Sequence, residues 1–288
     1  MSRSLPLGTR FLLLIALGLC LKAAAQPASL PVLKLTGIVN LPNQRCAVVE
    51  QPASPRSWDR HLILSEGQRQ ENIAVSKIQV ESGSVRLLRF ATNAATVRFT
   101  AITNPPAFGL VLENCNLTSV LNLYAGFRNR TVLRSPAVAD ASLSLVAATT
   151  NVAAAAAAIE KALSAQGAAT ILDGDKFVMV VPQGEVSRVN PHSSQLEAVP
   201  AQDLIPAGAL NFPAAVLMSV APIYAELLGR KFDPNTPAPL NGIIVLKNQT
   251  PLSKAECLYA LDTLFEWQGV KLVPQGDNLI KAVLIPKK

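Results

Sequence analysis

The chain has 288 residues, of which 50% are hydrophobic and 16% charged, and its formal net charge is +7. No run of lysines and arginines is interleaved with aromatic residues, so the sequence does not support nucleic-acid binding. Three of the cations, Arg3, Arg10 and Lys22, flank an N-terminal apolar run, and removing them lowers the net charge to +4, which is typical of a modestly basic, solvated surface.

The apolar run at residues 11–21 is too short to span a bilayer, and Ala23-Ala24-Ala25 follows it. This order predicts a signal peptide over residues 1–25, cleaved before Gln26, and export to the periplasm. Cys20 superficially suggests a lipoprotein signal, but Leu19 before it is not small. Lipidation of Cys20 is therefore disfavoured, although it stays open. No other long apolar segment occurs, so we expect at most a peripheral association with a membrane.

Residues 32–103 carry short alternating apolar patterns, which predict a small β domain. Strands are expected at 33–39, 46–49, 73–80 and 85–90. Turns are expected at Glu66-Gly67 and Ser82-Gly83, and the polar stretch 51–60 with its two prolines is expected to be a loop. The sequence Asn104-Pro105-Pro106 marks the end of this domain.

Residues 107–182 predict a mixed α+β domain. Asn116 is a plausible cap for a helix, and that helix has one apolar face formed by Leu117, Val120, Leu121, Tyr124 and Ala125. A half-buried strand is expected at 142–145. The alanine run 153–158 predicts a second helix that Gly167 ends, and a closing hairpin turns at Asp173-Gly174-Asp175.

Residues 183–206 are rich in Ser, Pro and Gln and predict a linker, and residues 207–288 repeat the pattern of the first α+β domain. The first helix of this second copy is expected to bury Val216, Val220, Ile223 and Leu227. We expect Pro213 in its first turn and, because Pro222 lies inside the helix, a kink or a break near Ala221. A strand is expected at 242–246. The second helix opens with a capping box, Ser253 and Glu256, buries Leu258, Leu261 and Phe265, and ends at Gly269. A hairpin turning at 274–277 closes the domain.

The two patterns align with an offset that grows slowly from 100 to 104 residues, as short loop insertions would cause. The coincidences are Leu117 with Leu217, Val120 with Val220, Tyr124 with Tyr224, Ala125 with Ala225, Arg130 with Arg230, Ile159 with Leu261, Leu163 with Phe265, Gln166-Gly167 with Gln268-Gly269, and Gly174-Asp175 with Gly276-Asp277. So many matches in one order predict an internal duplication, and a long linker between the copies predicts that they unfold independently. The expected fold class is α+β, with a small N-terminal β domain followed by two repeated β-α-β-β-α-β-type domains.

The second copy resembles the ring-forming N-domains of secretins, the outer-membrane channels of type II secretion and type IV pili. The first matching feature is the apolar helix whose end covers Tyr224 to Gly229-Arg230. The others, in chain order, are Asp233-Pro234, Asn241-Gly242 before an apolar strand, Pro251-Leu252 at the start of a helix, Trp267-Gln268-Gly269 at its end, and Ile285-Pro286. The first copy matches more loosely, through Asn116-Leu117, Thr131-Val132-Leu133, Pro136, Gly167 and Val181-Pro182. The resemblance implies a KH-like fold.

The N-terminal β domain is similar to the small periplasmic domain of inner-membrane components that dock on secretins. The similarity lies in Leu35-Thr36-Gly37-Ile38, Ala47-Val48, Glu66-Gly67 and the spacing of Val75, Ile78 and Val80. A secretin continues past its N-domains into a β-rich pore segment, whereas this sequence stops at Lys287-Lys288. The resemblance therefore implies vestibule-type domains without a pore.

No catalytic, cofactor-binding or metal-binding residues are predicted. His61 and His192, the only histidines, lie in polar sequence, and Asp173 and Asp175 are explained by a hairpin turn. Tyr124 and Tyr224 are expected to pack in the cores. The sequence leaves open whether Cys46, Cys115 and Cys257 include one disulfide or are buried thiols. The N-x-S/T sequons at Asn116, Asn129 and Asn248 would matter only in a eukaryotic secretory pathway.

Two functions are compatible with these observations. The favoured one is a non-enzymatic periplasmic component of a type II secretion or type IV pilus-like assembly, with a secretin or other secretion or pilus proteins as partners, no cofactor, and homo-oligomerisation as an option. The alternative is a periplasmic adaptor or binding protein that uses the same fold outside a secretin complex.

Overall fold

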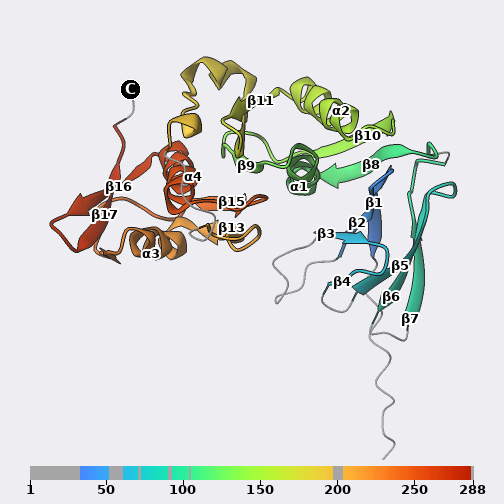
Figure 1. The fold of residues 1–288 in the computed structure, drawn as a ribbon, viewed down its shortest axis with the longest axis horizontal. Coiled ribbons are helices and arrows are strands. Elements are labelled where there is room, and N and C mark those ends of the chain that lie inside the picture. Colours follow the sequence, from blue (N-terminus) through green and yellow to red (C-terminus); the bar gives the residue numbers. More distant parts are fainter. Residues whose placement is uncertain are drawn as a thin grey trace, which may run out of the picture. The chain divides into compact units, whose positions relative to one another are not determined.

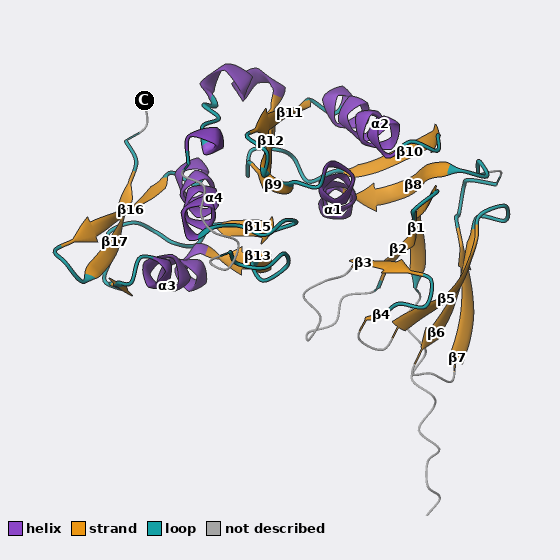
Figure 2. Ribbon diagram, viewed as in Figure 1, coloured by secondary structure: helices purple, strands orange, loops and turns teal. Residues whose placement is uncertain are grey.

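A computed structural model describes residues 33–51, 61–70, 73–89, 93–103, 105–196 and 204–286. This part of the chain is mixed α+β, with its strands in five small sheets (Figures 1 and 2). The predicted signal peptide at 1–25, Cys20 and most of the predicted loop at 51–60 lie outside the described residues. Within the described residues, no helix has both the length and the apolar character needed to cross a membrane.

The first strands form two antiparallel layers around a common core. One layer contains β1 (Lys34–Leu41), β2 (Gln44–Glu50) and β3 (His61–Ser65). The other contains β4 (Arg69–Gln70), β5 (Ile73–Gln79), β6 (Ser84–Arg89) and β7 (Asn93–Arg98). Their inward side chains form one cluster, which includes Leu35, Ile38, Val75, Ile78 and Leu87. The predicted strands and the turns at Gly67 and Gly83, both with positive φ, are confirmed; β3, β4 and β7 were not predicted.

The first sheet continues across the boundary expected at 104–106. Strand β8 (Gly109–Asn116) pairs with β1 on one side and with β10 (Ser142–Ala148) on the other, which gives the order β10-β8-β1-β2-β3. Residues 109–113 are all buried, so β8 lacks the alternation that marks a half-exposed strand. The sequence pattern therefore did not indicate that this strand, which the expected β-α-β-β-α-β order places before the first helix, pairs with β1.

The first α+β segment, residues 109–182, contains α1 (Leu117–Arg128), β9 (Thr131–Arg134), α2 (Val152–Ala165), β11 (Ala168–Asp173) and β12 (Phe177–Pro182) in addition to β8 and β10. The predicted cap is confirmed, because the Asn116 side chain accepts a hydrogen bond from the Ser119 N–H at 2.7 Å. Gly167, with φ of +78°, follows α2 as expected.

The second α+β segment, residues 211–284, has the same order of elements. It contains β13 (Asn211–Val216), α3 (Leu217–Leu227), β14 (Lys231–Phe232), β15 (Ile243–Lys247), α4 (Lys254–Trp267), β16 (Val270–Gln275) and β17 (Leu279–Leu284). The pairings also correspond: β8–β10 and β13–β15 are antiparallel, β12–β9 and β17–β14 are parallel, and β11–β12 and β16–β17 are antiparallel. The predicted capping box at Ser253 and Glu256 is confirmed.

Side-chain hydrogen bonds also recur at matching positions. Arg130 donates to the Gly174 carbonyl, and Arg230 donates to the Gly276 carbonyl at 2.9 Å. A glutamine after each second helix makes the other recurrent bond: Gln166 donates to Ser142 O at 3.0 Å and Gln268 to Ile243 O at 2.9 Å. The first pair ties the helix–strand connection to the hairpin tip, and the second ties the second helix to the sheet.

Two expectations about α3 are wrong, and of the expected kink or break the break does not occur. Pro213 lies in β13 rather than in a helical turn; β13 belongs to a two-stranded sheet with a register shift between Phe212 and Ala215, where a residue without an N–H is tolerated. Val216 caps the helix and is 43% exposed instead of buried. The helix continues through Pro222, which is exposed, so water can reach the carbonyl group that loses its donor there.

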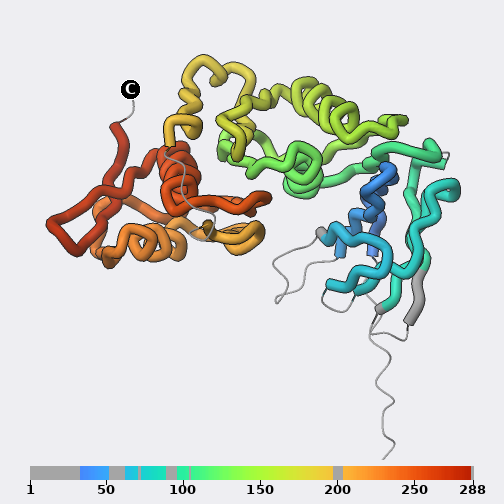
Figure 3. The backbone as a smooth tube through the Cα atoms, viewed as in Figure 1, coloured from blue at the N-terminus to red at the C-terminus, as the bar shows by residue number. Residues whose placement is uncertain are grey.

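The predicted linker at 183–206 does not leave the two segments separate. Its described part forms short 3-10 turns at Gln183–Arg188 and Ser193–Gln195, which come directly after β12 along the yellow part of the tube in Figure 3. Ser193 is buried. One hydrophobic cluster combines Leu133, Phe177 and Met179 of the first segment with the core of the second. The expectation of independent unfolding is therefore replaced by a prediction of coupling.

Candidate interaction site

The contact between the two segments is centred on a buried carboxylate, Asp173, at the end of β11. Only 1% of this residue is exposed. One oxygen accepts a hydrogen bond from the Ser193 N–H at 2.8 Å, and the other accepts one from the Tyr259 hydroxyl of α4. A buried charge is tolerated only when it is well hydrogen-bonded. Asp173 therefore holds the hairpin of the first segment, the linker and the second segment together.

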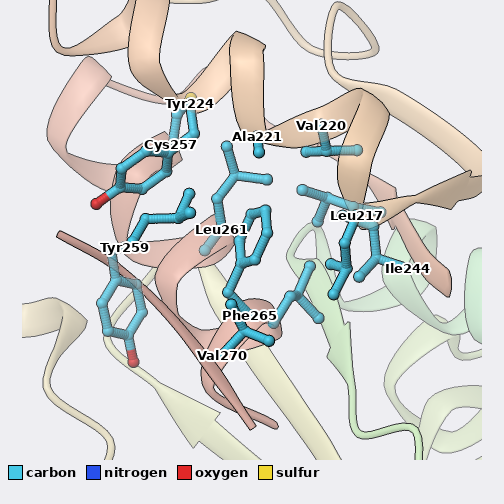
Figure 4. Packing of buried hydrophobic residues seen from close by; sticks show 14 of the residues in the cluster. Leu217, Val220, Ala221, Tyr224, Ile244, Cys257, Tyr259, Leu261, Phe265 and Val270 are labelled. Atoms are coloured by element: carbon cyan, nitrogen blue, oxygen red, sulfur yellow. The ribbon is translucent and has the colours of Figure 1, made fainter. Parts of the chain in front are cut away.

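Tyr259 lies at the margin of the second segment's core, with its hydroxyl directed away from Leu261 (Figure 4). Its ring makes edge contacts with Phe177, at a centroid distance of 5.4 Å, and with His192, at 4.7 Å. Burial, and then the hydrogen bond to Asp173, raise the pKa of Tyr259 above its usual range. The phenol is thus held neutral and serves as a hydrogen-bond donor.

Two further hydrogen bonds join the segments at the same side. Lys176 Nζ, next to the hairpin turn, donates to the Pro251 carbonyl at 2.8 Å. The Gln249 N–H donates to the Thr131 hydroxyl at 3.1 Å. The Pro251 carbonyl and the Gln249 N–H both belong to the loop before α4. This loop and α4 therefore form the second segment's side of the contact.

The contact uses different surfaces of the two segments. With the offset of 102 residues between them, the counterpart of Asp173 is Gln275 and the counterpart of Tyr259 is Ala157. Both counterparts are exposed. The outer face of α2 and the tip of the β16–β17 hairpin are therefore the unoccupied equivalents of the two surfaces that meet inside the chain.

Edge strands lie beside this contact. Strand β9 pairs only with β12, and β15 pairs only with β13, so each has one unpaired edge in the described sheets. A cleft of about 230 Å³ between them is lined by Arg134, Pro136, Ile243, Val245 and neighbouring residues. Arg134 donates to Val138 O at 2.9 Å and forms an ion pair at 3.4 Å with Asp140, which also lines the cleft; within the described residues its buried Nε has no hydrogen-bond partner. The cleft exposes apolar side chains next to this ion pair.

The structure places the other candidate residues as follows. The thiols of Cys46, Cys115 and Cys257 are free and buried, which decides against a disulfide, and burial raises the pKa of each to about 12. Within the described ranges, no group of three His, Cys, Asp or Glu residues has a geometry for a metal ion. His192 is near Tyr259, whereas the side chain of His61 lies outside the described part.

Tyr124 and Tyr224 pack in the cores of their segments, as predicted. The Tyr124 hydroxyl donates to Glu160 at 2.7 Å, and Arg128 pairs with the same carboxylate. Burial, followed by the hydrogen bond to Glu160, raises the pKa of Tyr124 to about 12. Burial also raises the pKa of Tyr224, with Asp262 in the equivalent position. These pairs fasten the two helices of each segment to one another.

Sequence reasoning missed the role of Asp173, which it assigned to turn formation alone. A comparison of the two copies could have indicated this role. Asp173 stands where the second copy has Gln275, and Tyr259 stands where the first copy has Ala157. Comparison with protein-family models and with curated proteins gave no match to this chain.

Proposed function

We propose that this protein is a non-enzymatic periplasmic component of a bacterial type II secretion or type IV pilus-like assembly, which contributes secretin-vestibule-type domains. The observation that carries the proposal is the pairing of two segments with the same strand and helix order through non-equivalent surfaces. In this proposal residues 107–182 and 207–288 are repeated KH-like domains, residues 32–103 are a docking domain, and residues 1–25 direct export.

The asymmetry of the internal contact supports a role in assembly. A contact between unlike surfaces of like units leaves one surface of each kind unused, and such contacts propagate into rings or filaments. Here the unused surfaces are the α2 face around Ala157 and the hairpin tip around Gln275, both exposed. A neighbouring copy or a related domain of a partner can occupy them.

The unpaired strand edges provide a second type of partner site. An extended segment of another protein can add a strand to an exposed edge, where backbone hydrogen bonds supply affinity and side-chain pockets supply specificity. The edge of β15 offers Ile243, which is 57% exposed, next to Pro136 and the Arg134 guanidinium. A partner strand with an apolar side chain at this position would fit there.

A cleft of about 650 Å³ favours the alternative, a periplasmic adaptor or binding protein. It is lined mainly by polar groups, among them Gln44, Asn122, Asn211 and Gln249, which suit a hydrogen-bonding ligand. Gene neighbourhood separates the two proposals, because secretion or pilus genes beside this one would favour the assembly.

The direct test is cross-linking in cells, recovery of the tagged chain from membranes and mass spectrometry. The proposal expects enrichment of a secretin or another secretion or pilus protein. A charge-exchanged variant, Lys254→Glu with Glu266→Lys on exposed positions of α4, keeps the net charge and is expected to reduce that enrichment. A normally folded wild-type chain that enriches no such protein would refute the proposal.

A further inference from the structure

The outer face of the β4–β7 sheet carries a cluster of cations, which we call the basic face: Arg69, Lys77, Arg86 and Arg98. The registers place them together, because Lys77 pairs with Arg86, while Arg98 pairs with Ser84, which is paired in turn with Gln79. All four cations are exposed. The opposite face of the same sheet contributes Ile73, Val75, Ile78 and Leu87 to the N-terminal core.

A β-bulge places Lys77 on this face. The β5–β6 register shifts between Val75 and Lys77, so Ser76 is an extra residue and its hydroxyl donates to Arg86 O at 3.0 Å. If the strand had no bulge, strict alternation after Val75 would turn Lys77 inward and Ile78 outward. Bulges re-aim side chains in this way and commonly do so at functional positions. The bulge thus exposes the lysine while Ile78 returns to the core.

The charge arrangement is unfavourable for the isolated fold. Lys77 and Arg86 stand directly opposite each other, and like charges in that position destabilise a sheet. Among the described residues, no ion pair includes Lys77, Arg86 or Arg98. The strands β4–β7 contain no acidic residue that could offset them. An anionic partner would convert this repulsion into attraction.

We propose that the basic face binds the surface of an anionic phospholipid bilayer. The cations lie on one side of a four-stranded sheet with polar Gln79 and Thr96 between them, which suits an extended array of phosphate groups. The same strands contain no aromatic residue, whereas single-stranded nucleic acids are held by stacking on aromatic rings. This inference concerns the N-terminal sheets and does not depend on the proposed assembly.

The test is co-sedimentation of the full chain with vesicles of phosphatidylcholine alone or with about a third phosphatidylglycerol. Apolar contributions to binding are common to both vesicle types, so the difference between them measures the electrostatic part. Each cation near an anionic surface adds roughly fivefold to affinity. We therefore expect Lys77→Gln with Arg86→Gln to weaken anionic-vesicle binding by roughly 25-fold. Neutral-vesicle binding is expected to remain unchanged.

The matched control is Lys231→Gln with Lys271→Gln, which removes the same charge from exposed strand positions of the second segment. It is expected to change binding by less than about threefold. Thermal melting of the Lys77→Gln, Arg86→Gln chain should be unchanged or slightly raised, because a like-charge pair is removed. Equal losses in both double variants would overturn the proposal, and so would tighter binding of single-stranded DNA than of anionic vesicles.

Discussion

Replacing Tyr259 with phenylalanine isolates one hydrogen bond in the contact between the two α+β segments. The variant keeps the ring that contacts Phe177 and His192, but among the described residues it leaves Asp173 with the Ser193 N–H as its remaining donor. A hydrogen bond to a charged group contributes about 1.5–3 kcal/mol, and an unsatisfied buried acceptor costs a similar amount. Because Asp173 is 1% exposed, we expect Tyr259→Phe to lower the free energy of unfolding by about 1.5–3 kcal/mol.

A double-mutant cycle with Asp173→Asn tests whether this loss comes from the contact itself. The two residues belong to different segments, so a coupling energy of about 1–2 kcal/mol would measure their connection directly. Tyr124→Phe is the control, because it removes a tyrosine hydrogen bond that lies within the first segment alone. Its coupling to Asp173→Asn should stay within about 0.5 kcal/mol.

Urea unfolding followed by two probes provides the assay. Trp267, the last residue of α4, reports on the second segment by fluorescence in a Trp58→Phe background, and far-UV circular dichroism reports on the whole chain. The two transitions should coincide in the wild type and separate when Asp173 and Tyr259 are both changed. Separate transitions in the wild type, or a coupling below about 0.3 kcal/mol, would refute the reasoning.

Three other predictions follow from burial. The folded-state pKa of each of the three tyrosines is raised, to about 12 for Tyr124. The contribution of each tyrosine to the free energy of unfolding should therefore be fully present below pH 10 and fall by about 1.4 kcal/mol per pH unit as the pH rises toward 12. Above pH 10, the absorbance of ionised tyrosine at 295 nm should rise only together with unfolding; a rise near pH 10 in the folded chain would contradict this. Leu163→Ala and Leu261→Ala, each fully buried, should cost about 2–5 kcal/mol in urea unfolding, and a loss under 1 kcal/mol would contradict their burial. The three described cysteines should react with a thiol reagent only on unfolding; rapid modification of the native chain at pH 8 would show that their thiols are accessible.

The sequence by itself determined the local elements. Asn116 and Ser253 begin helices because their side chains accept the free N–H groups of the first turn, and Gly167 and Gly269 follow the ends of α2 and α4 because glycine adopts positive φ without strain. The recurrence of these signals at a nearly constant offset also predicted the matching order of elements. Such features depend on neighbours in the chain, so they can be read without knowledge of the fold.

Only the tertiary structure decided which distant elements meet. Strand β8 joins the N-terminal strands in one sheet, although prolines at 105 and 106 suggested a boundary. Its pairing depends on how its buried residues 109–113 pack, and the flanking sequence does not specify this. Asp173 has the sequence context of a turn residue, and its burial depends on a tyrosine 86 positions later. Side-chain periodicity specifies which face is buried; it does not specify what covers that face.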